Sequence, residues 1–193
     1  MSTLFAYASL VSRRSIEATL GSPVGLVRPA RLAGWRRRWS VARDNRRAEK
    51  RFAGPDGELF PWCLALNLER APDAPPEEWP NGALIELDEE QLARLDAREL
   101  RYRRVDVSAW VRADIVPAGP VYAYVARPEH HFPDPPAGAV VIAAYLEAVE
   151  AAFSELGPGS LASFRATTAP PPVPVIPVKL VHDEAQAGNP REW

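Results

Sequence analysis

Two short segments of the sequence combine residue types suited to acid–base chemistry on an acyl group. The first, FAYASL at residues 5–10, has the pattern of a strand that runs directly into a turn and then a helix. Such a turn presents consecutive backbone N–H groups, which bind a carboxylate or a developing oxyanion. The second, LDARELRYRRV at residues 95–105, places Glu99 where a helix ends and a strand begins. A carboxylate in that position is either a catalytic acid/base or a structural cap or arginine partner.

Motifs for several common chemistries are missing from the sequence. There is no GxGxxG, GxxxxGK[ST], GxSxG or HExxH pattern, so nucleotide binding, α/β-hydrolase chemistry and zinc peptidase chemistry lack support. Residues 129–131, EHH, include metal-ligating types, but the flanking prolines favour a solvated loop over a metal site. The single cysteine, Cys63, excludes an internal disulfide and a zinc site built on cysteines.

A basic stretch with interleaved aromatic residues spans residues 35–51. Aromatic rings within a basic patch can stack on bases while arginines bind phosphates, as in a module that binds single-stranded nucleic acid. We favour a plainer interpretation, in which Trp35 and Trp39 face inward from a strand and a solvated basic loop follows. An electrostatic role of the arginines toward an anionic substrate is a further alternative. The net charge of −2 also speaks against a general polyanion binder.

The elements that position these segments mix strands with helices. Alternating apolar residues predict strands, at residues 3–7, 62–68, 83–87, 105–111 and 121–125. Other patterns predict helices, at residues 12–20, from residue 88 onwards and at 139–156, the last ended by Gly157–Pro158. Ser12 and Asp88 are suitable N-caps, Gln91 can complete a capping box, and Gly21 can stop the first helix. Strands outnumber helices and do not alternate strictly with them, which predicts an α+β fold, a small mixed β-barrel or curled sheet flanked by helices.

The length and composition fit one domain over residues 1–193. The 193 residues are 47% hydrophobic and 25% charged, which is enough to bury a core. The 21 prolines cluster at residues 72–80, 117–136 and 170–177. The first two clusters are typical of surface connections. The third, within APPPVPVIPV, is apolar and predicts an extended strap, from Pro170 to Val178, in polyproline or edge-strand geometry.

The sequence shows no sign of export or membrane insertion. Its start, MSTLFAYASLVSRR, lacks the basic and apolar regions of a signal peptide. The longest apolar stretch, residues 137–146, is far shorter than the roughly 20 residues that a membrane span needs. We therefore expect a cytoplasmic protein without a membrane partner.

The pairing of FxYxSL with a later LDxxExxYxRxxV resembles the γ-glutamylcyclotransferase family. That group includes glutathione-acting enzymes, γ-glutamylamine cyclotransferases and plant avirulence-induced-gene-like proteins. The stretch ARLAGWRRRW at residues 30–39 and the strand at residues 82–87 are also similar to family features. The resemblance covers roughly residues 3–126. It matches the segment after that, a long helix and the strap over residues 137–181, less specifically.

The resemblance implies a function and a set of site residues. The family's acid/base glutamate falls on Glu99, and the tyrosine that lines the family's site falls on Tyr102. The family's YGSL loop, whose amides hold the γ-glutamyl group, falls on Tyr7, Ala8, Ser9 and Leu10. The implied reaction closes a γ-glutamyl amine or peptide to 5-oxoproline and releases the amine, with no metal or organic cofactor. The leaving group stays open among glutathione, γ-glutamyl dipeptides, γ-glutamyl-ε-lysine and other amines, and so does the oligomeric state.

One departure from the family pattern concerns Ala8, which stands where the family has glycine. If the turn needs a positive φ there, alanine costs roughly 1 kcal/mol and tilts the next amide. We expect a negative φ, because a non-glycine residue at positive φ is uncommon. The alternative function is a non-catalytic small-molecule-binding protein on the same fold, which a strained Ala8 would favour.

Overall fold

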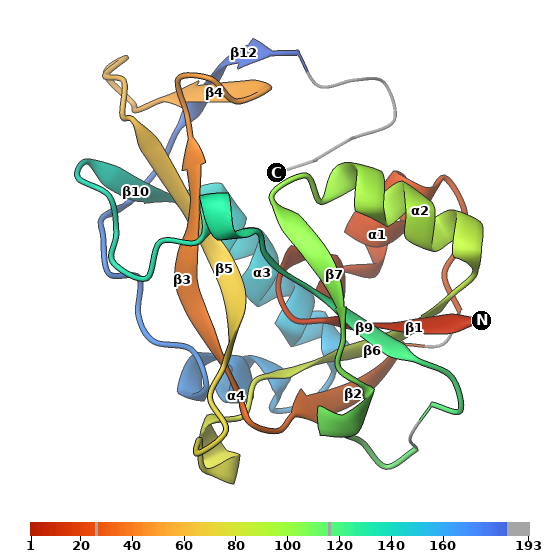
Figure 1. Cartoon of the computed structure of the whole chain (residues 1–193). Coiled ribbons are helices and arrows are strands. Elements are labelled where there is room, and N and C mark those ends of the chain that lie inside the picture. Colours follow the sequence, from red (N-terminus) through yellow and green to blue (C-terminus); the bar gives the residue numbers. More distant parts are fainter. Residues whose placement is uncertain (26, 116, 185–193) are drawn as a thin grey trace.

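The computed structural model describes residues 1–25, 27–115 and 117–184 of the chain. These residues form curled β-sheets flanked by four α-helices (Figure 1). The strands are β1 (Ser2–Ala6), β2 (Val27–Leu32), β3 (Trp35–Asp44), β4 (Lys50–Ala53), β5 (Trp62–Arg70), β6 (Asn81–Leu87), β7 (Tyr102–Asp106), β8 (Val111–Arg112), β9 (Val121–Ala126), β10 (Ala139–Ile142), β11 (Val175–Ile176) and β12 (Lys179–Asp183). The α-helices are α1 (Arg13–Leu20), α2 (Glu89–Arg98), α3 (Ala143–Leu156) and α4 (Ser160–Ala166). Short 3₁₀ turns are η1 (Ser9–Val11), η2 (Pro76–Glu78), η3 (Ser108–Trp110) and η4 (Pro128–His130).

Two larger sheets and one strand pair make up the β-structure. The six-stranded sheet has the order β7-β9-β1-β6-β2-β8, with β1 antiparallel to β6 and parallel to β9. The second sheet has the order β11-β10-β5-β3, and β12 pairs with β4. Hydrogen bonds join the larger sheets: the Tyr102 hydroxyl donates to the Leu66 carbonyl at 2.9 Å, the Ala126 amide donates to Asn67 Oδ1 at 2.9 Å, and Arg37 of β3 donates to the Asn81 carbonyl of β6. This mixed, curled arrangement confirms the predicted α+β fold class.

The sheets curl around a core that leaves little room beside β1. In Figure 1 the pair α1 and α2 lies on one side of the sheets, while α3 runs behind β5. Gly82 of β6 lies against the end of β1, where a Cβ atom would stand 2.2 Å from the Ala6 carbonyl oxygen and 2.8 Å from the Phe5 ring. Glycine therefore permits the close approach that fixes the start of the Tyr7–Leu10 turn.

The predicted ends of α1 and the predicted start of α2 are confirmed in detail. The Ser15 amide donates to Ser12 Oγ at 3.2 Å, and Gly21 closes α1 with φ of 66°. At α2, the Gln91 amide donates to Asp88 Oδ1 at 2.8 Å while the Asp88 amide donates to Gln91 Oε1 at 3.0 Å. This capping box fixes where α2 begins, and thereby where its far end delivers Glu99.

The helix predicted for residues 139–156 begins later than expected. Residues 139–142 form β10, which runs parallel to β5 and to β11, and only Ala143–Leu156 is helical. All four β10 residues are buried between these neighbours. Burial between two strands favours the β-branched run Val140–Ile142 in a sheet.

The strand predicted for residues 105–111 is interrupted. Strand β7 ends at Asp106, whose carboxylate accepts hydrogen bonds from the Ser108 amide at 2.9 Å and the Ser108 hydroxyl at 2.6 Å. This side-chain turn leads into η3, and the chain returns to strand geometry only at β8. The alternation of valines continues through the turn, so periodicity alone did not reveal the break.

The apolar proline-rich strap lies along the edge of the second sheet. Val175 and Ile176 form β11, which pairs in parallel with Val141 and Ile142 of β10, in the predicted edge-strand geometry. The Trp39 indole N–H donates to the Ala169 carbonyl at 3.0 Å and holds the approach to the strap. None of the helices in the described ranges is long and apolar enough to cross a membrane.

Candidate active site

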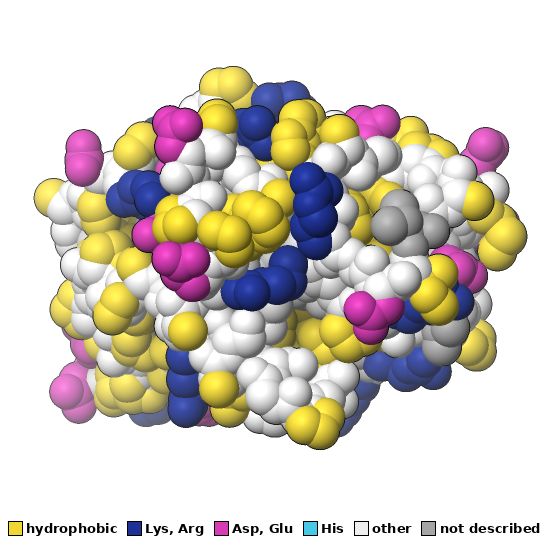
Figure 2. All heavy atoms as spheres, turned by 90° about the horizontal axis from the view of Figure 1, so that it is seen from below, with side chains coloured by type: hydrophobic (Ala, Val, Ile, Leu, Met, Phe, Trp, Pro, Cys, Tyr) yellow, Lys and Arg dark blue, Asp and Glu magenta, His cyan; other side chains and the backbone are white. Residues whose placement is uncertain are grey.

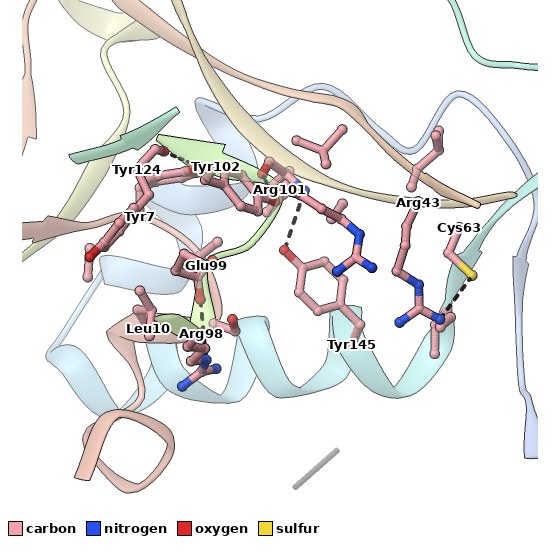
Figure 3. Close-up of a pocket in the computed structure, with 18 of the residues that line it drawn as sticks. Tyr7, Leu10, Arg43, Cys63, Arg98, Glu99, Arg101, Tyr102, Tyr124 and Tyr145 are labelled. Carbon is pink, nitrogen blue, oxygen red and sulfur yellow. Dashed lines mark hydrogen bonds and ion pairs between the residues drawn. The ribbon is translucent and has the colours of Figure 1, made fainter. Parts of the chain in front are cut away.

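A cavity of about 90 Å³ lies between the end of β1, the end of α2 and the strands β3 and β5 (Figure 3). All six site residues expected from the sequence line it, together with residues from β3, β5, β10 and α3. The lining residues are Leu4, Phe5, Ala6, Tyr7, Ala8, Ser9, Leu10, Val41, Arg43, Cys63, Leu64, Ala65, Leu66, Arg98, Glu99, Arg101, Tyr102, Tyr124, Ile142 and Tyr145.

The turn after β1 forms one wall of this cavity. Ala8 has φ of −141° and ψ of −135°, so the predicted negative φ is confirmed and alanine lies outside the left-handed region that favours glycine. Ser9 and Leu10 open the 3₁₀ turn η1, whose first amides have no acceptor within the turn. Within the described residues, no hydrogen bond engages these two amides. They are therefore available to a ligand in the cavity.

Glu99 reaches the cavity from the C-terminal end of α2. Its amide donates to the Leu95 carbonyl at 2.9 Å, and its own carbonyl accepts the Tyr102 amide at 2.9 Å, so Glu99 closes the helix and opens the turn into β7. Its side chain is 12% exposed. Among the described lining residues Glu99 is the only acidic one. The sequence left open a surface pairing with a neighbouring arginine, and the pairing that forms is a buried one.

Arg98 holds the Glu99 carboxylate. Its Nε lies 3.2 Å from Glu99 Oε1, and its side chain is only 2% exposed. Its Nη atoms donate to the Ser15 carbonyl at 3.2 Å, to Ser15 Oγ at 3.2 Å and to the Thr19 hydroxyl. Helix α1 therefore anchors Arg98, and Arg98 in turn fixes the position of the carboxylate.

Tyrosines surround the Glu99 end of the cavity. The Tyr7 hydroxyl donates to the Tyr124 carbonyl at 2.7 Å, and the Tyr124 hydroxyl donates to Asp96 Oδ1 at 2.8 Å. Burial raises the pKa of Tyr7 well above its usual value, and the nearby Tyr145 and Glu99 raise it further. Burial and the Asp96 carboxylate raise the pKa of Tyr124 as well. Both phenols therefore stay protonated at neutral pH and serve as rigid, neutral walls.

Among the lining residues that were not singled out from the sequence as site residues, five carry charged or phenolic side chains. They are Arg43, Arg98, Arg101, Tyr124 and Tyr145. Arg98 and Arg101 flank Glu99 in the chain, so that spacing was the one available signal. The others come from β3, β9 and α3 and reach the cavity only through long-range packing. Figure 3 shows Arg43 and Arg101 on the side of Tyr145 away from Glu99.

The basic stretch is not built to stack on nucleic-acid bases. Trp35, Trp39 and Phe52 are buried, so the predicted inward orientation of the two tryptophans is confirmed. The expected solvated basic character holds for Arg46 and Arg47 but not throughout, since Arg43 is buried as well. On the face seen in Figure 2, the described Lys and Arg side chains are separated by acidic and hydrophobic ones and form no continuous strip.

Arg37 is the second buried arginine of that stretch. It is 1% exposed and shares the inward face of β3 with the tryptophans. Its guanidinium lies 4.7 Å from the Phe164 ring centre and donates to Thr168 Oγ1 at 2.8 Å. Burial lowers its pKa to about 9. Strand alternation places residues 35, 37 and 39 on one face, and that signal was available in the sequence.

The histidines do not gather with other metal-ligating types. Across residues 1–25, 27–115 and 117–184, no group of three or more His, Cys, Asp or Glu side chains is placed to hold a metal ion. Residues 128–130 form η4, and the neighbouring His131 Nε2 lies 2.9 Å from Glu69 Oε1.

The fold is that of the γ-glutamyl cyclotransferases. A solved γ-glutamyl cyclotransferase structure superposes with a TM-score of 0.57 at 14% identity, over 88% of each chain. The uncharacterized protein loc79017 from Homo sapiens gives 0.55 at 15% identity, also over 88% of each chain. YkqA from Bacillus subtilis gives 0.54 at 17% identity, over 84% of this chain and 52% of YkqA.

These likenesses confirm, at the level of the fold, the family resemblance seen in the sequence motifs. No protein-family model matches the chain, and no curated protein matches it either.

Proposed function

We propose that this protein is a γ-glutamylcyclotransferase-type enzyme that converts a γ-glutamyl amine or peptide into 5-oxoproline and a free amine. One observation carries the proposal: Glu99, the sole acidic side chain among the described lining residues, shares a small cavity with the turn Tyr7–Leu10. The fold supports the same assignment.

The turn and Glu99 suit the two ends of the glutamyl group. The amides of Ser9 and Leu10 bind the substrate carboxylate or the oxyanion of the tetrahedral intermediate, because both are anions and both amides are unengaged within the described residues. Tyr7 and Tyr102 shape the walls, but their hydroxyls already donate to the carbonyls of Tyr124 and Leu66. We therefore assign the tyrosines to shape and assign substrate hydrogen bonding to the amides.

The reaction then needs two proton transfers from the α-nitrogen and no outside nucleophile. The substrate's α-ammonium gives a first proton to the Glu99 carboxylate, and the free amine attacks the γ-carbonyl carbon to close a five-membered ring. The tetrahedral intermediate collapses, the bond from that carbon to the leaving nitrogen breaks as Glu99 gives its proton to that nitrogen, and the ring nitrogen passes its second proton through the Glu99 carboxylate to the released amine, which departs as an ammonium. Attacking nitrogen and acyl carbon belong to one molecule, so folding the substrate provides much of the rate gain.

A panel of γ-glutamyl compounds tests the proposal. The purified protein is incubated with γ-glutamyl amino acids, glutathione, γ-glutamyl-ε-lysine and γ-glutamyl alkylamines, and 5-oxoproline is quantified. We expect release from at least one member, in equal amounts with the free amine. Binding of panel members without any release would instead favour a non-catalytic binding protein on this fold. The negative φ of Ala8 argues against the left-handed alanine that would most have favoured that alternative.

A further inference from the structure

Two arginines, one buried and one partly buried, face the end of the cavity that lies away from Glu99. Arg43 comes from β3 and is 7% exposed, and Arg101 comes from the turn after α2 with a side chain 13% exposed. Both line the cavity, and Figure 3 shows both guanidinium groups directed into the space beyond the Tyr145 ring. Neither arginine is one of the motif residues that carry the family resemblance.

The two guanidinium groups are held in place. Arg43 Nη2 donates to the Lys50 carbonyl at 2.8 Å, and its guanidinium lies 5.0 Å from the Phe52 ring centre. Arg101 donates to both carboxylate oxygens of Glu49, at 2.6 and 3.2 Å. Orientation fixed before binding lowers the entropy that binding costs.

Both arginines act electrostatically on Cys63, which also lines the cavity. The Cys63 sulfur lies 3.9 Å from Arg43 Nη2. Burial raises the pKa of the Cys63 thiol, while the charges of Arg43 and Arg101 both lower it. The guanidinium groups therefore act together on the same small volume, although they come from different elements.

The charge of the cavity is positive at this end. Its described charged lining residues are three arginines and Glu99, and the Glu99 carboxylate is paired with Arg98. Glu49 offsets part of the charge of Arg101 from outside the lining. A buried excess of positive charge favours an anionic group and disfavours a cationic one.

We propose that Arg43 and Arg101 form a subsite for a carboxylate on the leaving group. This inference rests on the proposed function and narrows its substrate class to γ-glutamyl amino acids and peptides whose released amine carries a carboxylate. A guanidinium attracts a carboxylate through its charge and its N–H donors, whereas a leaving group without a carboxylate brings no negative charge to this end of the cavity. A leaving group such as lysine, released through its side-chain nitrogen, would bring an α-ammonium group together with its carboxylate toward this positive end, and the ammonium would offset the attraction of the carboxylate.

A matched pair of substrates tests the subsite. γ-Glutamylalanine and its C-terminal amide have the same shape and differ in one negative charge. We expect kcat/KM to favour the acid by about 10- to 100-fold, the usual effect of a hydrogen bond to a charged group. Arg101→Gln should lower this preference about tenfold, whereas Arg103→Gln, an exposed arginine outside the cavity, should leave it unchanged. Equal kcat/KM for acid and amide in the wild type would overturn the inference.

A second variant, Glu49→Gln, should change the preference for the acid over the amide in the opposite direction. Removing the carboxylate that offsets Arg101 should increase the preference for the acid severalfold if the subsite is electrostatic. If Arg101 only holds the local structure, Glu49→Gln and Arg101→Gln should both weaken the protein and leave the acid-to-amide ratio alone. That outcome refutes the subsite. Arg101→Lys serves where Arg101→Gln does not fold, and it should retain part of the preference because it keeps the charge.

Equilibrium binding separates failure of the subsite from failure of the proposed function. Calorimetry is run with 5-oxoproline, γ-glutamylalanine and its amide on Glu99→Gln and on the double variant Glu99→Gln/Arg101→Gln, which turn substrate over too slowly to disturb the titration. We expect the added Arg101→Gln to weaken the binding of γ-glutamylalanine but not of 5-oxoproline, which retains only the glutamyl carboxylate. Equal weakening of both would place the glutamyl carboxylate at the arginines and overturn the inference, with the cyclotransferase proposal intact. Absence of binding by all three compounds would refute both.

Discussion

Replacement of Glu99 by glutamine separates a proton-transfer role from a structural role. The substitution keeps the size of the side chain and removes its basicity. If Glu99 transfers the proton, turnover should fall by roughly 10²- to 10⁴-fold, the usual contribution of general acid–base catalysis. The assay is release of 5-oxoproline from the best substrate of the panel, at saturating concentration, so that the change is read in kcat.

The same substitution has a stability cost that follows from the buried ion pair. Glu99 is 12% exposed and its partner Arg98 is 2% exposed, so glutamine leaves the Arg98 charge without its carboxylate. The hydrogen bonds from Arg98 to Ser15 and Thr19 remain and limit the loss. We expect a decrease of about 1–3 kcal/mol in the free energy of unfolding. This is more than the small effect that a surface position would give, and denaturant unfolding measures it.

A matched control makes the result decisive. Glu69 is also partly buried, at 21% side-chain exposure, and accepts hydrogen bonds from Ser40 and His131 outside the cavity. Glu69→Gln should lower stability to a similar extent and leave kcat nearly unchanged. Turnover by Glu99→Gln within a few-fold of the Glu69→Gln value would refute the assignment of Glu99 as the acid/base.

Four further predictions concern the framework of the site. Thr19→Val removes a hydroxyl that accepts a hydrogen bond from Arg98, so it should lower kcat and decrease the free energy of unfolding by about 1–3 kcal/mol, measured with denaturant. An unchanged kcat would show that Arg98 does not position Glu99. Gly82→Ala places a methyl against the Ala6 carbonyl and should cost about 1–3 kcal/mol, and an unchanged melting temperature would contradict the close approach. Ala8→Gly should change the free energy of unfolding by at most about 1 kcal/mol, because φ of Ala8 is already negative. A larger gain in stability, measured by thermal unfolding, would contradict this conformation of Ala8. Burial raises the pKa values of Tyr7 and Tyr124, so their contribution to stability is full below pH 10, the pKa of tyrosine in the unfolded chain, and is lost as pH rises above it. The free energy of unfolding, monitored by tyrosinate absorbance, should therefore decrease above pH 10.

The elements nearest the site followed from local sequence signals. Ser12, Gly21, Asp88 and Gln91 mark helix ends through side-chain and backbone preferences that act within a few residues. For that reason the end of α2, and with it Glu99, could be placed before any long-range contact was known.

Features that depend on distant contacts could not be predicted in this way. Residues 139–142 form a strand only because β5 and β11 lie on either side of them. The valine alternation after Asp106 hid a turn that the Ser108 hydrogen bonds create. Arg43 and Tyr145 reach the cavity from β3 and α3, and nothing in their local sequence relates them to Glu99.

The most direct test of the central claim is the fate of the acyl carbon in water enriched in ¹⁸O. The wild-type protein is incubated with γ-glutamylalanine, and the products are identified by mass spectrometry. Attack by the substrate's own nitrogen predicts unlabelled 5-oxoproline in equal amount with released alanine, and no labelled glutamate. Glutamate carrying ¹⁸O would show that water attacks the carbonyl carbon and would contradict the cyclotransferase mechanism.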